Sequence, residues 1–571
     1  MKKNLFLSII GLLLFSTATI AQIRTIEHPE YESCNTGLFE IGKVEMTDTS
    51  TILYCNVFQR PNNWISLSSI NYLKGKSGKV YKFIRSEGFE MDKQVIMPAS
   101  GTISFKLYMK PLDKKETSFD FMEGENSDQF RILGIKSYKT KTKSTAPIHC
   151  LIKGEVIDRP QSHRLILIKA DGDQRISPTY ISIKNGKFEY ELNCQNLEAY
   201  ELIFLDENQN GMWQPITFFA EPGTVSLKLY PMDRFKETVV IGEPKTITSL
   251  NSELLGHSEK VIDKGQLNRE WAQYITLKDS LRNSGDIAKE KERIAKEDER
   301  LNNENLRYTD AAKEIMKQFD PKTDRRVSDS LVVLINKLQE TGGLFTSEAM
   351  ALDDQSKKMN EQYLKFELQY IRENTSIVGY SLLLSTTTIA LQHFKDLVPE
   401  CIDLYNSIYA KKYPKHPYTE QMKDKIISFT SVKVGGSYID FVAPDFLGQP
   451  VRLSEQIKGK VALIDLWASW CGPCRKSAKS MIPVYEAYKD KGFTIVGVAR
   501  ESELKSGINA AHKDKYPWLN LIELKDKGKI WEKYGVGNGG GGTFLVDKNG
   551  IILAMSPTDE EVKTILNKLL K

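Results

Sequence analysis

Alternating apolar and polar positions predict two β regions in the first half of the chain. Thr51–Phe58 alternates with the period of a half-buried strand, and turn residues separate it from similar segments. The pattern continues through residues 146–243, where Asn185-Gly186 precedes the apolar segment Lys187–Leu192 as a hairpin signal. We therefore expect two β-sandwich-like domains, at residues 30–145 and 146–243, joined by a polar linker.

Residues 247–430 carry a helical pattern. Apolar residues recur at intervals of seven within a segment rich in Lys and Glu, but a second apolar row is mostly missing. This favours a long, largely solvated helix with one packed stripe over a coiled-coil dimer. The region shows no catalytic constellation, so we expect a spacer, a surface for oligomerisation or a platform for partners. The apolar row consists of Ile287, Ile294, Leu301, Tyr308 and Ile315.

The pattern changes again in residues 434–571. Val461–Trp467 reads as a buried central strand, Phe493–Ala499 as a second one, and Asn549-Gly550 as the turn of a hairpin. The resulting β-α-β-α-β-β-α order predicts an α/β domain, a mixed sheet with helices on both faces. Helices are expected at Glu501–Asp514, Lys527–Tyr534 and Asp559–Leu570, the last with Thr558 as its N-cap.

The first residues have the layout of a secretory signal peptide. Lys2 and Lys3 precede the apolar run Leu5–Phe15, which is too short to span a bilayer comfortably, and small residues follow up to Ala21. We expect cleavage after Ala21, with 1–21 as signal peptide and the mature chain in the periplasm or cell envelope. An uncleaved membrane anchor is the alternative reading.

Composition narrows the function classes. The chain has a formal charge of +5, and the loss of two lysines with the signal peptide lowers it to +3, so the balance carries no nucleic-acid signature. A chain of 65.0 kDa is too long for one core, and roughly three to five domains are expected.

Five of the seven cysteines lie outside the most specific motif, at Cys34, Cys55, Cys150, Cys194 and Cys401. An oxidising compartment permits disulfides between Cys34 and Cys55 and between Cys150 and Cys194. Buried free thiols are an equally good reading of these four residues.

The most specific motif is Cys471-Gly472-Pro473-Cys474, directly after the predicted central strand. Two cysteines at this spacing at a helix start can close a small disulfide ring, and the helix N-terminus favours a thiolate. We expect Cys471 to be the exposed nucleophile and Cys474 the buried resolving thiol. A structural zinc site would need two further Cys or His ligands at motif spacing, so neither a metal nor a cofactor is expected.

Residues 434–571 resemble the thioredoxin fold, and more closely the TlpA/ResA type of exported thiol–disulfide oxidoreductase. The resemblance rests on Ala443–Phe446, Gly459-Lys460 and Trp467–Arg475. It implies a disulfide reductase that acts on protein or small-molecule disulfides and is re-reduced by a membrane thiol donor. It also matches Asp465 to the buried aspartate that assists proton transfer behind the resolving cysteine. A strand-end aspartate that reaches solvent is the alternative.

The same resemblance implies a substrate groove. Thioredoxin-like proteins place a cis-proline just before the hairpin strand, but Gly541 stands at that position here. Glycine can adopt the same dihedral angles without enforcing them, so we expect a looser grip on a peptide substrate. The predicted groove residues are Trp470, Gly472, Pro473, Gly541, Gly542 and Thr543.

The second β region also has a resemblance. Segments such as Asn185–Glu191 and Phe218–Leu229 are similar to the small β domain that precedes thioredoxin-like domains in envelope proteins of Bacteroidetes-type bacteria, a domain that carries no catalytic residues. An envelope binding or scaffold protein with a degenerate thioredoxin-like domain is therefore a competing function. A peroxidase is a third, but Ile464 and Ala468 stand where its Pro-x-x-x-Thr-x-x-Cys motif needs Pro and Thr.

Overall fold

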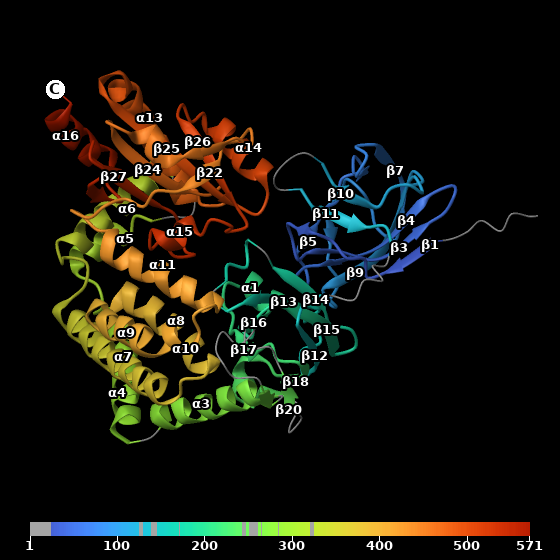
Figure 1. Cartoon of the computed structure of the whole chain (residues 1–571), viewed down its shortest axis with the longest axis horizontal. Helices are drawn as coiled ribbons and strands as arrows, with labels where there is room; N and C mark the ends of the chain where they lie inside the picture. The colour runs from blue at the N-terminus through green and yellow to red at the C-terminus, as the bar shows by residue number, and fades with distance from the viewer. Residues whose placement is uncertain are drawn as a thin grey trace, which may run out of the picture. The chain divides into compact units, whose positions relative to one another are not determined.

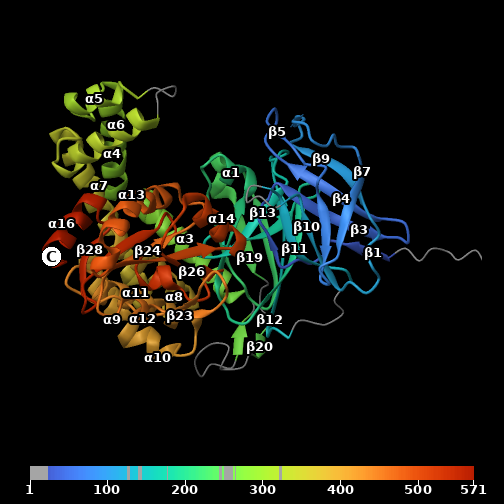
Figure 2. The ribbon, with the colours of Figure 1, turned by 90° about the horizontal axis from the view of Figure 1, so that it is seen from above.

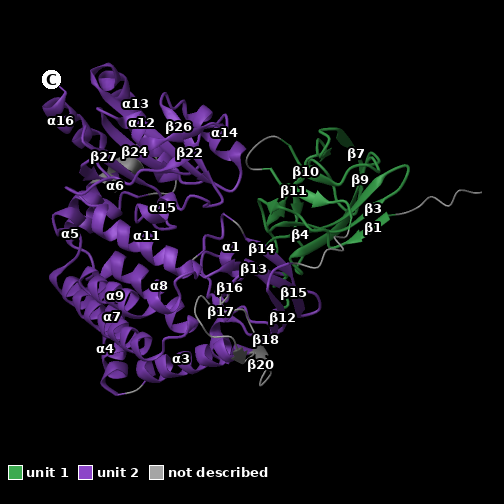
Figure 3. Ribbon diagram, in the orientation of Figure 1, with its two compact units in different colours: residues 1–143, 160–163 green, residues 144–159, 164–571 purple. Residues whose placement is uncertain are grey.

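Two units make up the described part of the chain, one from residues 1–143 and 160–163 and the other from residues 144–159 and 164–571 (Figure 3). The predicted signal peptide and most of the linker after residue 138 lie outside the described residues. The computed structural model describes residues 24–124, 129–138, 145–170, 172–176, 178–242, 247–249, 261–263, 265–283, 285–319 and 325–570.

The first unit is built on a nine-stranded antiparallel sheet of order β1-β3-β4-β9-β7-β6-β10-β11-β2. Phe39 lies at the centre of its apolar core, 4.8 Å from Phe121 between ring centroids. The strands are β1 (Arg24–Glu27), β2 (Ser33–Cys34), β3 (Phe39–Met46), β4 (Thr51–Phe58), β6 (Tyr72–Gly75), β7 (Val80–Glu87), β9 (Thr102–Met109), β10 (Ser118–Met122) and β11 (Arg131–Lys136), with β5 (Trp64–Ile65) paired to β8 (Val95–Ile96).

The second unit begins with two four-stranded sheets, of order β15-β12-β18-β19 and β14-β13-β16-β17 (Figure 1). Asn185 and Gly186 both adopt left-handed backbone angles, as a tight turn between strands requires. The strands are β12 (Ile148–Val156), β13 (Arg164–Lys169), β14 (Thr179–Ser182), β15 (Lys187–Cys194), β16 (Ala199–Phe204), β17 (Ile216–Phe219), β18 (Gly223–Leu229) and β19 (Val239–Gly242); the short helices α1 (Leu205–Gln209) and η1 (Met232–Glu237) connect some of them.

A helical region follows, and it shares an apolar core with these sheets. Glu221 fixes the connection, because its buried carboxylate accepts hydrogen bonds from the amides of Leu267 and Asn268 at the start of α3. Figure 2 shows α4, α5 and α6 extending from the rest of the unit. The helices are α3 (Gln266–Asn283), α4 (Gly285–Asn303), α5 (Asp310–Met316), α6 (Arg325–Glu340), α7 (Ser347–Glu373), α8 (Ile377–His393), α9 (Val398–Leu404), α10 (Ala410–Lys412) and α11 (Pro417–Ser431); the segment also holds η2 (Lys395–Leu397), η3 (Tyr405–Tyr409), and the strands β20 (Ile247–Ser249) and β21 (Val261–Asp263).

The single long helix predicted through residues 287–315 is wrong at its C-terminal end. Ile294 and Leu301 are buried, as the apolar stripe requires, but α4 ends at Asn303. Asn305 adopts a left-handed backbone angle, and the Thr309 side chain caps a new helix by accepting a hydrogen bond from the amide of Ala312. Among the described residues, every helix is too short or too polar to cross a bilayer.

The last domain has a mixed five-stranded sheet of order β26-β25-β24-β27-β28. The central strand β24 begins at Val461 and ends at Trp467, as predicted. Separate apolar clusters cover its two faces, one around Ile464 and Leu466 and the other around Leu463. The other elements are β22 (Val442–Pro444), β23 (Pro450–Arg452), α12 (Leu453–Ile457), α13 (Gly472–Tyr488), η4 (Lys489–Lys491), β25 (Phe493–Glu501), α14 (Leu504–Asp514), β26 (Leu519–Leu524), α15 (Ile530–Lys533), β27 (Gly542–Val546), β28 (Ile552–Met555) and α16 (Asp559–Leu569).

Two predicted helix starts in this domain are wrong. Glu501 belongs to β25, and the following helix begins at Leu504. The helix expected from Lys527 is confined to Ile530–Lys533, because Lys529 adopts a left-handed backbone angle. The predicted cap of the last helix is confirmed, since the Thr558 hydroxyl accepts a hydrogen bond from the Glu561 amide.

The five cysteines outside the motif form no disulfide in the described part of the chain. Cys34 and Cys55 lie on strands that are not neighbours in their sheet, and the two proposed partners in the second sheet are out of register, with Cys150 opposite Leu192. The structure therefore has neither of the two possible disulfides, Cys34–Cys55 and Cys150–Cys194, and agrees with the alternative of unbridged thiols.

Candidate active site

The CGPC motif stands where β24 ends and α13 begins. Cys471 and Cys474 are joined by a disulfide, with their Cα atoms 5.3 Å apart. Cys471 is the N-cap of α13, and its Sγ accepts a hydrogen bond from the Cys474 amide at 3.2 Å. A sulfur in this position faces the positive end of the helix dipole, which favours the thiolate once the disulfide is reduced.

The exposure of the two sulfurs is the reverse of the prediction. Cys471 is 5% exposed and packs in the same apolar cluster as Ala468 and Trp531, whereas Cys474 is half-buried. Gly472 and Pro473, between them, are exposed. The open face of the motif is therefore the start of α13.

Asp465 lies in the middle of β24, between Gly497 of β25 and Thr543 of β27. It is 3% exposed, and one carboxylate oxygen has no hydrogen-bond partner among the described residues. Burial raises the pKa of Asp465 to about 7. The alternative of a strand-end aspartate that reaches solvent is wrong. Because side chains alternate along a strand, Asp465 lies on the same face as Trp467. Cys474 packs against the apolar cluster of Trp467 and also against that of Ile464 and Leu466 on the other face.

Glu501 is a second buried carboxylate near the motif, and sequence reasoning missed it. It is 1% exposed, and its two oxygens accept hydrogen bonds from the Ser469 amide at 2.5 Å and the Ser469 hydroxyl at 2.9 Å. Burial raises its pKa to about 7. These hydrogen bonds hold Ser469, two positions before Cys471, in place. An acidic residue at the end of an otherwise apolar strand is the sequence signal that could have identified it.

Arg475 is bound to the protein, which differs from the solvated residue that its place after the motif suggests. Its guanidinium donates to both carboxylate oxygens of Asp514 and to the Ser469 carbonyl. Lys479 pairs with the same Asp514 at 2.8 Å. Although burial opposes it, hydrogen bonds from these two cations lower the pKa of Asp514 to about 2. This network ties the start of α13 to the end of α14.

Gly541 approaches the disulfide closely. Its amide donates a hydrogen bond to the Sγ of Cys474 at 3.1 Å. A Cβ atom added at Gly541 would lie 1.9 Å from the Leu466 carbonyl oxygen and 2.9 Å from the Cys474 sulfur. The position therefore requires glycine in this conformation. We expected glycine to leave the substrate groove looser, but the backbone at Gly541 lies in close contact with Leu466 and Cys474.

We expect Gly541→Ala to destabilise the oxidised domain by about 1–3 kcal/mol, because either the loop or the end of β24 must move to admit the methyl group. Thermal unfolding of the oxidised full-length protein measures this. Gly539→Ala is the matched control, since a Cβ atom there meets nothing within 4 Å. An unchanged melting temperature for Gly541→Ala would contradict the close contact.

The other predicted groove residues lie around the same disulfide. Gly542 pairs with Leu466 and Thr543 with Asp465 in the antiparallel register of β24 and β27. Trp470 packs beside Trp531, with ring centroids 6.0 Å apart. No group of three or more His, Cys, Asp or Glu side chains that could hold a metal occurs in the described part of the chain.

Known proteins match this last domain. A family model described as the AhpC/TSA family matches residues 434–555. The thiol-disulfide oxidoreductase ResA of Geobacillus thermodenitrificans is 30% identical over 143 residues, which are 24% of this chain and 80% of that protein. The chain belongs to the ResA family of thiol-disulfide oxidoreductases. ResA of Bacillus thuringiensis is 32% identical over 144 residues, 24% of this chain and 79% of its own length.

Solved structures cover the same ResA-type part. The thioredoxin domain of a thiol-disulfide oxidoreductase from Bacteroides vulgatus is 29% identical and covers 25% of this chain and 100% of its own, with a TM-score of 0.23. A thiol:disulfide interchange protein from Bacteroides sp. is 30% identical and covers 25% of this chain and 92% of its own, also with a TM-score of 0.23. The ResA-type domain forms about the last quarter of a much longer chain.

Proposed function

We propose that this protein is an exported disulfide reductase that acts through the Cys471–Cys474 pair. The observation that carries the proposal is the position of the Cys471 sulfur, which caps α13 and accepts a hydrogen bond from the Cys474 amide. This geometry stabilises a thiolate, the nucleophile of thiol–disulfide exchange. The reducing direction rests on the CGPC sequence and its resemblance to reducing members of the family.

In the proposed reaction, the Cys471 thiolate attacks one sulfur of a substrate disulfide. A mixed disulfide forms between Cys471 and the attacked sulfur, and the other substrate sulfur leaves as a thiolate that takes up a proton. Cys474 then loses its proton and attacks the Cys471 sulfur, which releases the second substrate thiolate and closes the Cys471–Cys474 disulfide. The substrate gains two electrons, and a dithiol donor must return two electrons to the protein before the next turnover.

Asp465 is the proposed proton acceptor for Cys474. A general base is most effective when its pKa lies near the working pH, and burial gives Asp465 a pKa of about 7. Asp465 shares its face of β24 with Trp467, whose apolar cluster is one of the two against which Cys474 packs. Gly541 supports the same sulfur, because its amide hydrogen bond stabilises negative charge on Cys474.

The remaining parts of the proposal concern location and partners. A signal peptide at residues 1–21 would deliver the protein to the periplasm or cell envelope, where a membrane thiol donor would re-reduce it. Protein or small-molecule disulfides are the proposed substrates, and the helical region is a proposed surface for oligomerisation. We also propose that the sheets of residues 146–243 form a sandwich-like domain of the Bacteroidetes type, and that no nucleic acid, metal or cofactor takes part.

We expect Cys474→Ser to accumulate mixed disulfides with its substrates in cells, because the variant keeps the nucleophile and loses the thiol that releases the product. Non-reducing electrophoresis followed by mass spectrometry of the adducts measures this and identifies the substrates. The double variant Cys471→Ser, Cys474→Ser is the control. If the single variant forms no more adducts than the double variant, the chain is better explained as an envelope scaffold protein.

A further inference from the structure

The turn between β13 and β14 lies against the CGPC domain. In its described part, the Ile176 amide donates to the Asp173 carbonyl at 3.0 Å, and the Arg175 amide donates to the Asp173 carboxylate at 2.9 Å. These bonds give residues Asp173–Ile176, named here the β13–β14 turn, a defined shape.

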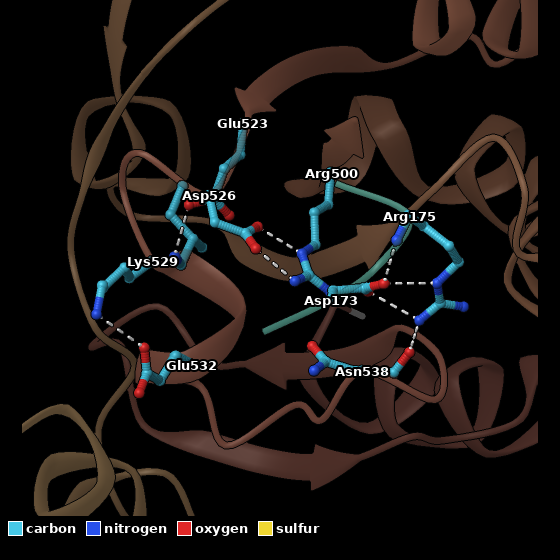
Figure 4. Close-up of polar contacts among 9 residues, drawn as sticks. Asp173, Arg175, Arg500, Glu523, Asp526, Lys529, Glu532 and Asn538 are labelled. Carbon is cyan, nitrogen blue, oxygen red and sulfur yellow. Dashed lines mark hydrogen bonds and ion pairs between the residues drawn. The ribbon is translucent and has the colours of Figure 1, made fainter. Parts of the chain in front are cut away.

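A buried ion pair anchors the β13–β14 turn. Asp173 accepts a hydrogen bond from Arg500 of β25 at 3.0 Å, and the two side chains are 2% and 5% exposed. Arg500 also pairs with Asp526 (Figure 4). It lies 5.0 Å from the centre of the Trp531 ring. Removal of one partner from a buried pair leaves an uncompensated charge, so this contact holds the turn in place.

Arg175 reaches both segments that flank the disulfide. Its guanidinium carbon lies 3.7 Å from the centre of the Trp470 ring, in cation–π geometry, and it donates a hydrogen bond to the Asn538 carbonyl (Figure 4). Trp470 directly precedes Cys471, and Asn538 lies in the loop that carries Gly541 to Cys474. One side chain thus bridges the two edges of the proposed groove.

The start of α13 and the loop before Gly541 leave open space beside the motif. Gly472 and Pro473 are exposed, and a Cβ atom added at Gly472 or Gly540 would meet nothing within 4 Å. A small or extended disulfide can approach over this side. Cys471 is only 5% exposed. A folded protein that approaches it over Trp470 and the Asn538 loop would meet Arg175, which contacts both segments.

We propose that the β13–β14 turn is a wall of the substrate groove, and that Arg175 is a specificity-determining residue that favours small or unfolded disulfides over disulfides in folded proteins. The inference rests on the proposed function, because it concerns the substrates of the same site. It gives the second β region a role in substrate choice, although that region contributes no reacting group.

Access to the reduced Cys471 tests the wall directly. In full-length Arg175→Ala, we expect a bulky polyethylene-glycol maleimide to modify Cys471 about tenfold faster than in the wild type, because the stacking and hydrogen bonds of the guanidinium are lost. Iodoacetamide, which is small, should change its rate less than about twofold. The tryptic peptide Val461–Arg475 holds both Cys471 and Cys474, so fragmentation of this peptide in the mass spectrometer assigns the modified sulfur.

Arg234→Ala is the matched control. Arg234 belongs to the same β region, pairs with carboxylates as Arg175 does, and both side chains are 38% exposed. Asp173→Asn removes the carboxylate that pairs with both Arg500 and Arg175, and it should shift the maleimide rate in the same direction. If Arg175→Ala and Asp173→Asn react with the maleimide as Arg234→Ala does, the wall is overturned.

Turnover measurements separate this inference from the proposed function. The ratio of kcat/KM for a folded protein disulfide to kcat/KM for glutathione disulfide should rise about tenfold in Arg175→Ala and stay unchanged in Arg234→Ala. A wild-type protein that reduces no disulfide contradicts the proposed function, while the modification rates still decide the wall. If the wild type reduces disulfides but Arg175→Ala has the same substrate ratio and the same maleimide rate, only the proposed wall is contradicted.

Discussion

Replacing Cys471 by serine is expected to lower disulfide reduction at least about a thousandfold, because a hydroxyl is almost fully protonated near neutral pH and is a poor nucleophile toward sulfur. Serine keeps the N-cap interaction with the Cys474 amide, since hydroxyl oxygens accept this bond readily. Loss of activity in a folded variant therefore isolates the chemical role of the sulfur. The measurement is reduction of a model disulfide by the purified protein, with dithiothreitol as electron donor.

Cys34→Ser is the control for this experiment. Cys34 is a half-buried free thiol in the first unit, and its Sγ donates to the Thr36 carbonyl, an interaction that serine reproduces. Activity of this variant should equal that of the wild type. An unchanged rate in Cys471→Ser would contradict the assignment of the nucleophile, and an equal loss in both variants would point to a folding defect.

The last domain could be predicted from its sequence because local and global signals agree there. Val461–Trp467 is continuously apolar apart from Asp465, and a strand buried on both faces needs that pattern. The Cys471–Cys474 spacing at a helix start then locates the chemistry without any long-range information. The start of α15 was less predictable, since it depends on a single residue, Lys529, that adopts a left-handed angle.

The exposure of the site could not be predicted in the same way. Whether Cys471 faces solvent depends on residues that are far away in sequence, including Trp531 in its apolar cluster. The contact of Arg175 with Trp470 joins residues almost three hundred positions apart, and nothing in the local pattern around either residue indicates it. Glu501 was overlooked because it stands at a strand end, where a charged side chain usually reaches water.

Asp465→Asn is expected to change the pH dependence of stability. The pKa of Asp465 is about 7 in the folded protein against 3.8 for the ordinary group, so the folded state binds the proton more tightly. Its contribution is therefore fully present below about pH 4 and is lost as the pH rises through 7. Asparagine does not titrate, so between pH 5 and pH 8 the variant should gain roughly 2–3 kcal/mol relative to the wild type.

Hydrogen exchange of the β24 amides across a urea series, at each of the two pH values, measures this change in the domain that carries Asp465. Asp490→Asn is the control, because that aspartate lies on the exposed turn after α13. If the variant and the wild type lose stability in parallel between pH 5 and pH 8, Asp465 does not titrate in this range. The proposed base role would then lose its physical basis.

Asp465→Asn should slow catalysis in the same pH range in which it stabilises the fold. Without a carboxylate behind Cys474, the thiol must lose its proton to water, and release of the second substrate thiolate should slow on the order of 10²-fold at pH 7. Attack by Cys471 should be unaffected, so mixed disulfides accumulate in rapid-quench experiments with Asp465→Asn. A variant that is more stable at pH 8 and slower only in the release step would show that the unpaired carboxylate in β24 is retained for proton transfer.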